Sequence, residues 1–356
     1  MLNSYSLRRF LAALLATGSP ASFAVSTIDT INQAIQQAST GETVDFSIQE
    51  DILIPSHQVG GDPYAAQEWA AIINPEGVTL QISGLQSNGQ KSSFTGGERT
   101  EFVDLTRPLL NQNGASMKLE NLTFDNCYYY RKGRTAPLGG AIANFGGTLE
   151  VRSCDFNGNG IRGYDRFCGG GAIASAWPIQ NDPIRPSTTL LIDCTFTGNF
   201  ATTDPAIDHS AQGGAFYNDE ISPSIVRQCV FNNNYIIVNK MGTGNTSGGG
   251  AIGDFGPMEI DGCSFSGNHV ISTGNTAALS AAIYGGAIWS ICDLNSINSL
   301  TIRNSVFENN YIQTLYRQAM GGAICLRGTA LNTIIDSSFF NNFNASSNYY
   351  GGAIDT

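Results

Sequence analysis

The sequence is poor in charge, and above all in lysine. Only 13% of its 356 residues are charged, lysine occurs four times, and the formal net charge is −11. Proteins that bind duplex nucleic acid neutralise phosphates with clustered cations, so this acidic chain is excluded from that class. Histidine occurs only at positions 57, 209 and 269, and the chain has no Cys-x-x-Cys motif. Because the usual zinc-ligand spacings are missing, we expect no metal and no other cofactor.

Long hydrophobic runs are also missing, since a membrane-spanning helix needs about 18 or more apolar residues and no stretch of the chain supplies them. The start of the chain is instead typical of a secretory signal peptide. Arg8 and Arg9 precede a short apolar segment, residues 10–16, and small residues follow up to Ala24. We therefore predict a signal peptide over residues 1–24. The mature chain is expected to be exported, to the cell outer membrane and surface or into the medium, with no membrane span of its own.

Glycine is abundant, with 41 residues, and much of it belongs to a repeat. Gly-Gly-Ala followed by an apolar residue occurs seven times, at intervals of 30 to 43 residues. The copies are Gly139, Gly140, Ala141, Ile142; Gly170, Gly171, Ala172, Ile173; Gly213, Gly214, Ala215, Phe216; Gly249, Gly250, Ala251, Ile252; Gly285, Gly286, Ala287, Ile288; Gly321, Gly322, Ala323, Ile324; and Gly351, Gly352, Ala353, Ile354.

A second motif, Phe-x-x-Asn, alternates with the first. Its copies are Phe156 and Asn159, Phe196 and Asn199, Phe231 and Asn234, Phe265 and Asn268, Phe307 and Asn310, and Phe339 and Asn342. A further copy at Phe124 departs from the pattern, because Cys127 stands where Asn is expected. Strict alternation identifies residues 111–356 as a repeat region. One repeating rod therefore replaces the two or three globular domains that the length alone would suggest.

The residues before each phenylalanine indicate the structure of one repeat. Five positions earlier the chain is apolar, as at Val151, and two positions earlier it is small or apolar, as at Cys154; the two residues between are mostly polar. This is a strand of period 2 that runs into a kink and resumes, and no helical period fits it. Short strands with corners, repeated along the chain, predict an all-β fold. We expect a right-handed parallel β-helix whose coils lie about 4.8 Å apart.

Each motif residue has an expected role in such a β-helix. The phenylalanines should stack in the core. The asparagines should lie at a corner in the left-handed conformation and bond one another as a ladder. The glycine pair should permit a turn that residues with a Cβ would resist. The unequal spacing of the motifs predicts loops that leave the coil, over residues 128–137, 177–186 and 242–247.

A capping helix is predicted before the first coil. Ile28, Ile31 and Ile35 follow the spacing of an amphipathic helix over residues 27–38, and an alternating strand follows it over 44–48. A helix laid over the first coil would cover its open core and its unpaired strand edge.

Three segments follow from these patterns. Residues 1–24 form the signal peptide, residues 25–110 the capping helix and irregular first coils, and residues 111–356 the repeats. No comparable cap follows the last repeat, so we expect the natural polypeptide to continue beyond Thr356.

The alternation of Gly-Gly-Ala-Ile with Phe-x-x-Asn over residues 111–356 resembles the polymorphic outer membrane proteins of chlamydiae. The resemblance implies a type V autotransporter, with a signal peptide, a β-helical passenger at the cell surface and a C-terminal β-barrel. This sequence holds no series of alternating segments that would form a barrel, so we expect either a fragment of such a protein or a shorter secreted relative.

The resemblance also implies adhesion to host cells, a virulence function in which both motifs take part. On this basis the motif residues given above, from Gly139 to Asn342, are the candidate binding residues, although they can act indirectly by holding the fold. The expected partner is a host-cell receptor or glycan. Self-association and disulfide cross-linking with envelope proteins are further expectations of the same kind.

Eight cysteines in an exported chain raise the possibility of disulfides. Cys154, Cys194, Cys229 and Cys263 share one column, and side chains stacked in register lie nearly 5 Å apart, whereas a disulfide prefers about 3.8 Å between Cβ atoms. Serine replaces cysteine in the later repeats. We therefore expect a buried column of free thiols. The remaining four, Cys127, Cys168, Cys292 and Cys325, lie off this column and could form cross-links.

The alternative function is binding or cleavage of polysaccharide. Glycoside cleavage needs two carboxylates that converge on one bond. The position three residues after each motif alanine forms a polar column with one acid, Asp254, and we expect Asp219 to lie on an adjacent coil. This is the best carboxylate pair in the sequence, and corner or surface positions account for it more simply. We therefore predict a binding scaffold without a catalytic site.

Overall fold

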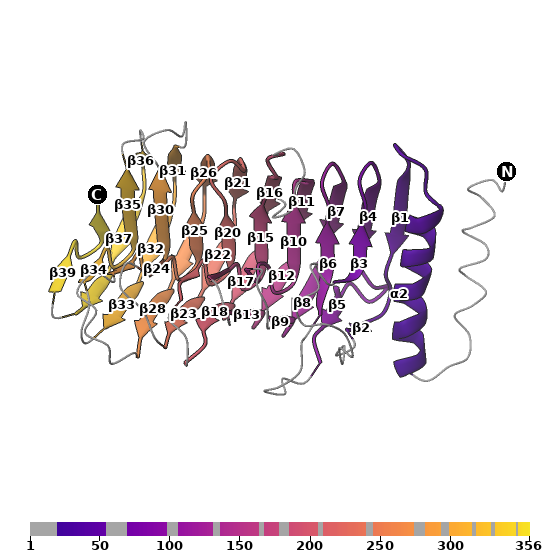
Figure 1. Ribbon diagram of the computed structural model, residues 1–356, viewed down its shortest axis with the longest axis horizontal. Helices are drawn as coiled ribbons and strands as arrows, with labels where there is room; N and C mark the ends of the chain where they lie inside the picture. Colours follow the sequence, from indigo (N-terminus) through magenta and orange to yellow (C-terminus); the bar gives the residue numbers. More distant parts are fainter. Residues whose placement is uncertain are drawn as a thin grey trace.

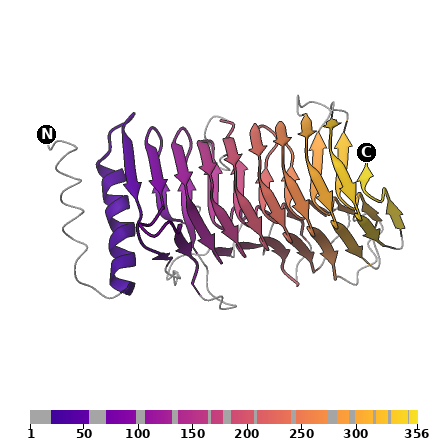
Figure 2. The same cartoon turned by 180° about the vertical axis from the view of Figure 1, so that it is seen from behind.

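The computed structural model describes residues 20–54, 70–97, 106–130, 136–163, 167–177, 185–205, 209–239, 245–273, 282–292, 299–314, 318–328, 332–346 and 348–356. Nearly all of the strands pair in parallel and stack coil on coil into one elongated β-solenoid (Figure 1). One helix, α2 (Pro20–Gln37), covers the end where the chain starts, as the view from behind also shows (Figure 2). The predicted parallel β-helix with an N-terminal helix is therefore confirmed.

Each complete coil passes through five sheets, which we number 1 to 5 in the order in which the chain visits them. Sheet 1 holds β1 (Thr43–Ser47), β4 (Thr79–Ser83), β7 (Ser116–Glu120), β11 (Thr148–Arg152), β16 (Thr188–Ile192), β21 (Ser224–Arg227), β26 (Met258–Asp261), β31 (Leu300–Arg303) and β36 (Thr333–Ile335). Sheet 2 holds β2 (Ile52–Leu53), β5 (Ser92–Thr95), β8 (Leu122–Asp125), β12 (Asp155–Asn157), β17 (Thr195–Thr197), β22 (Val230–Asn232), β27 (Ser264–Ser266), β32 (Val306–Glu308) and β37 (Ser338–Phe340).

Sheets 3 and 4 join the stack after the first coils. Sheet 3 holds β9 (Tyr128–Tyr130), β13 (Gly160–Gly163), β18 (Phe200–Thr203), β23 (Tyr235–Val238), β28 (His269–Ser272), β33 (Tyr311–Thr314) and β38 (Phe343–Ala345). Sheet 4 holds β14 (Cys168–Gly169), β19 (Ala211–Gln212), β24 (Thr246–Gly248), β29 (Ala282–Tyr284), β34 (Gln318–Met320) and β39 (Asn348–Tyr350). Sheet 5 holds β3 (Ala70–Asn74), β6 (Arg107–Asn111), β10 (Ile142–Phe145), β15 (Ile173–Ala176), β20 (Phe216–Asn218), β25 (Ile252–Asp254), β30 (Ile288–Cys292), β35 (Ile324–Gly328) and β40 (Ile354–Asp355).

Adjacent coils pair in register at the repeated motif. Phe156 lies opposite Phe196, and Ile142 lies opposite Ile173. The early strands obey the same register, since Val44 lies opposite Leu80. The first coils, predicted to be irregular, keep this register although the two motifs are absent from their sequence. Among the described residues, however, they have strands in sheets 1, 2 and 5 only, and an antiparallel bridge joins Leu85 to Lys91 between β4 and β5.

Two left-handed residues bend each coil at the ends of its sheet 2 strand. One precedes the small residue that comes two before Phe, as at Ser153, and the other precedes the motif asparagine, as at Asn233. The predicted kink is confirmed. The prediction that the motif asparagine itself is left-handed is wrong, because positive φ falls on the residue before it: Asn126, Gly158, Gly198, Asn233, Gly267, Asn309 and Asn341. The motif asparagine needs a backbone that directs its amide into the coil.

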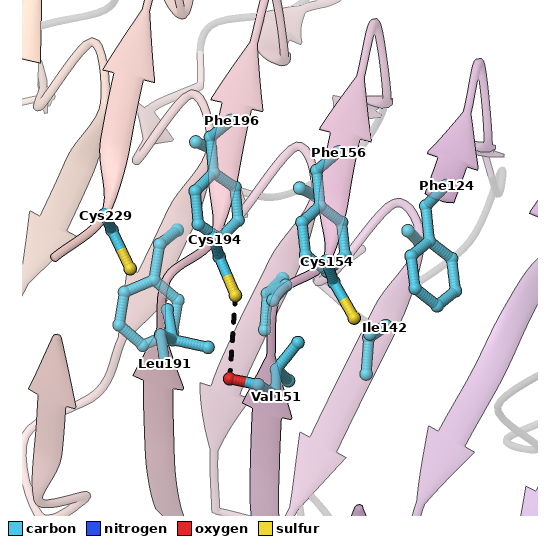
Figure 3. Close-up of a cluster of buried hydrophobic side chains, with 14 of the residues drawn as sticks. Phe124, Ile142, Val151, Cys154, Phe156, Leu191, Cys194, Phe196 and Cys229 are labelled. Carbon is cyan, nitrogen blue, oxygen red and sulfur yellow. Dashed lines mark hydrogen bonds between the residues drawn. The ribbon is translucent and has the colours of Figure 1, made fainter. Parts of the chain in front are cut away.

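Each coil that has all five sheets encloses two separate cores. Sheets 1, 2 and 5 surround the main lobe, which contains the motif phenylalanines and isoleucines such as Phe156 and Ile142. Sheets 3 and 4 surround a smaller side lobe, with Ile161 and Ala211 among its buried residues. In the main lobe the phenylalanines form one continuous stack, with ring centroids 4.6 to 5.3 Å apart between Phe94 and Phe339. Figure 3 shows part of this stack beside the cysteine column.

The capping helix follows the predicted spacing but is longer than predicted. It begins at Pro20 and ends at Gln37. Ile28, Ile31 and Ile35 are buried and belong to the core of the main lobe. Because these side chains lie over the first coil, they close the main lobe at this end, as the sequence predicted.

The predicted excursions are only partly described. Residues 131–135, 178–184 and 240–244 lie outside the described residues. Within the predicted segments, however, Tyr128–Tyr130 is strand β9 and Thr246–Gly248 is strand β24. The prediction of loops is therefore wrong for these residues, which belong to the side lobe.

Candidate binding surface

The asparagines of the Phe-x-x-Asn motif form a buried ladder. Asn159, Asn199, Asn234, Asn268 and Asn310 are fully buried. The Oδ1 of Asn234 accepts hydrogen bonds from both the backbone N–H and the Nδ2 of Asn199, at 3.0 and 2.9 Å. Its Nδ2 donates to the Oδ1 of Asn268 and to the carbonyl oxygen of Phe196, each at 2.9 Å. The same pattern repeats along the stack, so each amide is satisfied without water.

Cys127 begins this ladder in place of an asparagine. Its backbone N–H donates to the Oδ1 of Asn159 at 2.9 Å, and its thiol donates to the carbonyl oxygen of Phe94 at 3.3 Å. The thiol thus replaces the side-chain N–H that an asparagine would direct to the preceding coil. Phe94 was missed in the sequence because no Asn follows it three residues later. The alternation of Ser92 and Phe94 inward with Ser93 and Thr95 outward was the available signal.

The two motifs face each other across a neck that separates the two lobes. A Cβ at Gly214 would lie 2.1 Å from the carbonyl oxygen of Gly250 and 2.6 Å from that of Tyr235, the residue after the motif asparagine. Gly171 meets Phe200 and Gly286 meets Tyr311 in the same way. Only glycine allows two backbones to approach so closely. Each coil needs one copy of each motif, on opposite sides of its neck. The two motifs therefore alternate along the chain.

The structure places nearly every predicted binding residue in the interior. In the copies from Gly139 to Ile324, all residues of both motifs are buried. Phe339 and Asn342, in the last described coil, are half-buried. A macromolecular partner cannot contact side chains that stack inside the coil. The motif residues are thus brought together as a structural column, and the surfaces that a partner can contact are made by other residues.

The predicted polar column is confirmed and is also internal. It runs through Asn74, Asn111, Asn144, Ser175, Asn218, Asp254 and Ser290, all of them buried. Asn218 Nδ2 donates to Asp254 Oδ1 at 3.0 Å, and Ser290 Oγ donates to Asp254 Oδ2 at 3.0 Å. Burial raises the pKa of Asp254 to about 7, against the opposing effect of these donors and of the Gly256 N–H.

Asp219 and Asp254 do not converge on a common accessible point. The residue opposite Asp254 on the preceding coil is Asn218, so Asp219 is displaced from it by one position. The Oδ2 of Asp219 accepts a hydrogen bond from the backbone N–H of Trp177. Burial raises the pKa of Asp219, and only 3% of its surface is exposed. The expectation of corner or surface positions is wrong as to the surface, since both carboxylates are buried, but Asp219 does lie at a corner, the turn between β20 and β21.

The cysteine column is a ladder of free thiols, as predicted. Each thiol donates to the carbonyl oxygen two residues earlier, as Cys154 does to Arg152 and Cys229 to Arg227, both at 3.2 Å. Cys194 also lies 3.5 Å from the carbonyl oxygen of Val151, the contact drawn in Figure 3. In the next coils Ser305 Oγ takes the same role, donating to Arg303 at 2.7 Å. The column selects a small side chain with a donor, which adds a second hydrogen bond to a carbonyl oxygen that already accepts a backbone N–H from the preceding coil, as Arg227 does from Asp193.

The cysteines off this column are free as well, where the structure describes them. Cys127, Cys168 and Cys325 are buried. Burial raises the pKa of the Cys168 thiol to about 12, and that of Cys325 to about 12. The expectation that they could form cross-links is therefore wrong for these three in the folded chain. The side chain of Cys292 lies outside the described residues.

The candidate binding surface is the outer face of sheet 1 at the end near α2. A groove of about 690 Å³ crosses β1, β4, β7 and β11 there. Its sides are two rows of outward side chains, in register from coil to coil. The first row is Asp45, Gln81, Lys118 and Glu150, and the second is Ser47, Ser83, Glu120 and Arg152. We call this feature the sheet 1 groove.

Within the described ranges, no group of three or more His, Cys, Asp or Glu side chains could hold a metal ion. No helix of the described chain is both long and apolar enough to cross a bilayer. No protein-family model, curated protein or solved structure matches this sequence.

Proposed function

We propose that this chain is the β-helical passenger of an autotransporter-like outer membrane protein, displayed at the cell surface or secreted, and that it acts as an adhesin for host cells. The repeated motifs and their resemblance to the chlamydial family support the proposal. The signal-like start of the sequence supports export. The β-solenoid itself supports a scaffold, since it offers long flat faces with one side chain per coil at a regular spacing.

One observation carries the proposal: the constant residues are inside and the variable ones are outside. Along the first outward row of sheet 1 the residues are Asp45, Gln81, Lys118, Glu150, Leu190, Ile225 and Glu259. From β12 onward, the inward positions keep the phenylalanine and asparagine of the motif. Because the interior alone holds the coil together, the outer positions are free to be chosen for recognition. Many weak contacts along such a face add up when several copies or sites bind at once.

The test is binding of the purified chain, without residues 1–24, to cultured epithelial cells. We expect saturable binding that excess unlabelled protein blocks and that clustering on beads strengthens. Asn234→Ala, an interior change, should lower binding only in proportion to its loss of folded protein. If the unaltered folded chain shows no saturable binding, the adhesin proposal fails. If Asn234→Ala abolishes binding while its thermal midpoint is unchanged, the motif contacts the partner directly and the scaffold reading is wrong.

A further inference from the structure

The sheet 1 groove runs along the axis of the solenoid and not along a strand. It crosses four neighbouring strands of one parallel sheet, whose in-register partners include Gln81 with Lys118 and Lys118 with Glu150. Strands in a sheet lie about 4.8 Å apart, so three intervals span roughly 14 Å. A chain molecule lying in the groove therefore meets a pair of side chains at each coil. A monosaccharide unit of a linear glycan spans about the same distance as one coil.

The charges in the groove nearly balance. Lys118 lies opposite Glu150, and Glu120 lies opposite Arg152, so each cation has an acid beside it on the adjacent strand. Arg152 also pairs with Glu150 on its own strand. Only Asp45 adds an unbalanced charge. A polyanion or a polycation would meet as much repulsion as attraction, which disfavours charged polymers.

The hydrogen-bonding capacity of the groove is high and available. Lys118 and Glu120 are exposed and form no ion pair within the described part of the chain. Carboxylates accept two or more hydrogen bonds, ammonium and guanidinium groups donate several, and the amide of Gln81 does both. Vicinal hydroxyl groups, which are both donors and acceptors, match such a mixed lining. Charged partners also make stronger hydrogen bonds than neutral ones.

The groove has a defined end. On the next coil the two rows continue as Leu190 and Ile192, opposite Glu150 and Arg152. These half-buried aliphatic side chains do not line the groove, but they make the outer face of sheet 1 apolar directly beyond it. The C–H face of a terminal sugar ring can pack against this apolar surface while its hydroxyl groups bond the polar rows. The two polar rows thus end at an apolar surface after β11.

We propose that the sheet 1 groove binds a neutral, linear oligosaccharide that lies along the solenoid axis, with about three sugar units in contact with β1 to β11. The proposal deepens the proposed function, since a host-cell glycan is one of the partners expected of an adhesin, and it rests on that function. It assigns recognition to side chains that belong to neither repeated motif.

The experiment measures binding of the chain without residues 1–24 to cellotetraose, maltotetraose and chitotetraose, with a heparin-derived tetrasaccharide as the charged probe. We expect at least one neutral tetrasaccharide to bind saturably, with an affinity that added salt leaves nearly unchanged because no net charge is neutralised. Glu150→Gln and Lys118→Ala should each weaken it about tenfold or more, as loss of a charged hydrogen-bonding partner does. The matched control is Glu259→Gln, the same change in the same outward row but outside the groove, and it should have no effect.

Three results would overturn the proposal: no binding of any neutral probe, stronger binding of the heparin fragment, or equal weakening by Glu259→Gln. All three variants change side chains on the outer face of sheet 1, exposed at Lys118 and half-buried at Glu150 and Glu259, so their thermal midpoints should match that of the unaltered chain. Cell binding, measured in parallel, separates the two proposals. Cell binding without glycan binding overturns the groove assignment alone, and absence of cell binding by the unaltered chain overturns the adhesin function.

Discussion

Asn234 and Asn268 lie one coil apart, and the Nδ2 of the first donates to the Oδ1 of the second at 2.9 Å in a site without water access. Replacement of Asn234 by alanine would leave the backbone N–H and one side-chain N–H of Asn199 without an acceptor, and would remove the donor that Asn268 and Phe196 share. Each unsatisfied buried group costs about 1–3 kcal/mol. We therefore expect Asn234→Ala to lower the free energy of unfolding by about 3 kcal/mol or more.

This prediction is checked by urea unfolding followed by circular dichroism. The matched control is Asn232→Ala, two residues away on β22, whose side chain lies on the outward side of sheet 2. The control should change the free energy of unfolding by no more than about 0.5 kcal/mol. Equal effects of the two variants would contradict the role of the ladder.

Variants at two glycines test two effects separately: the close approach of neighbouring backbones and the left-handed backbone conformation. Gly214→Ala places a methyl group 2.1 Å from the oxygen of Gly250, with backbone on both sides, so we expect little or no folded protein. Gly198 has φ of +63° and open space around its Cβ position. Gly198→Ala should therefore cost only about 1–2 kcal/mol of left-handed strain, and Gly198→Asn should cost less, because Asn233 takes the same corner position one coil later.

Yield and thermal midpoint of the three glycine variants measure this prediction. A folded Gly214→Ala with a near-normal midpoint would show that the neck can widen, against the close approach described above.

Asp254 should make stability depend on pH. Its pKa in the folded chain, about 7, lies above the ordinary value because burial disfavours the charged form. Protonation therefore stabilises the fold: the contribution is fully present below about pH 4 and is lost as the pH rises through about 7. We expect this contribution to reach up to about 4 kcal/mol.

The measurement compares the free energy of unfolding of the unaltered chain with that of Asp254→Asn from pH 4 to pH 8. Asparagine fits this column, since it occupies the same position at Asn144 and Asn218. As the pH rises, the free energy of unfolding of Asp254→Asn should increase relative to that of the unaltered chain. A difference that is independent of pH would show that Asp254 titrates normally.

The cysteine column should tolerate serine and resist oxidation. Cys229→Ser keeps a donor to the carbonyl oxygen of Arg227, as Ser305 does in its own coil, so we expect a change in stability of at most about 1 kcal/mol. Cys229→Val removes that donor, while the carbonyl oxygen of Arg227 keeps the backbone N–H of Asp193, so it should cost about 0.5–1.5 kcal/mol more than Cys229→Ser.

Thiol alkylation followed by mass spectrometry gives an independent check. In the native chain the buried cysteines should stay unmodified, and after denaturation without reductant Cys127, Cys154, Cys168, Cys194, Cys229, Cys263 and Cys325 should all be alkylated. If full alkylation is reached only after a reductant is added, two of these cysteines form a disulfide.

The fold was predictable because its two strongest constraints are local and periodic. Phenylalanine three residues before asparagine, and glycine before glycine, recur in every repeat coil, and each position has a steric or hydrogen-bonding reason. The first coils were harder to predict, because Phe94 has no following asparagine and the register there is set by alternation alone. The position of the left-handed residue is hidden where two asparagines adjoin, as at Asn233 and Asn234, which differ only in the direction of the side chain. In other coils Gly158, Gly198 and Gly267 mark this position, and that signal was available in the sequence.

The surface was less predictable than the interior. Nothing in the sequence joins Asp45 to Lys118 or Glu150, which lie on different coils and are brought into one groove only by the register of sheet 1. The motif residues, in contrast, were predicted as binding residues because they repeat, but their repetition reflects packing. Asp219 and Asp254 are a similar case. The sequence pattern predicts that these two acids are neighbours, but the fold displaces them from each other and buries both.

The asparagine ladder gives the rod an intrinsic polarity. Every described amide points the same way, with its NH₂ group toward the later coil and its oxygen toward the earlier one, as from Asn159 to Asn199 and from Asn310 to Asn342. The backbone partners fix this sense, since Phe carbonyls cannot exchange places with N–H groups. The aligned amide dipoles therefore sum along the axis, as peptide dipoles do in a helix. A further coil can join the ladder in one orientation only, because its amide must match the direction of the amide in the preceding coil.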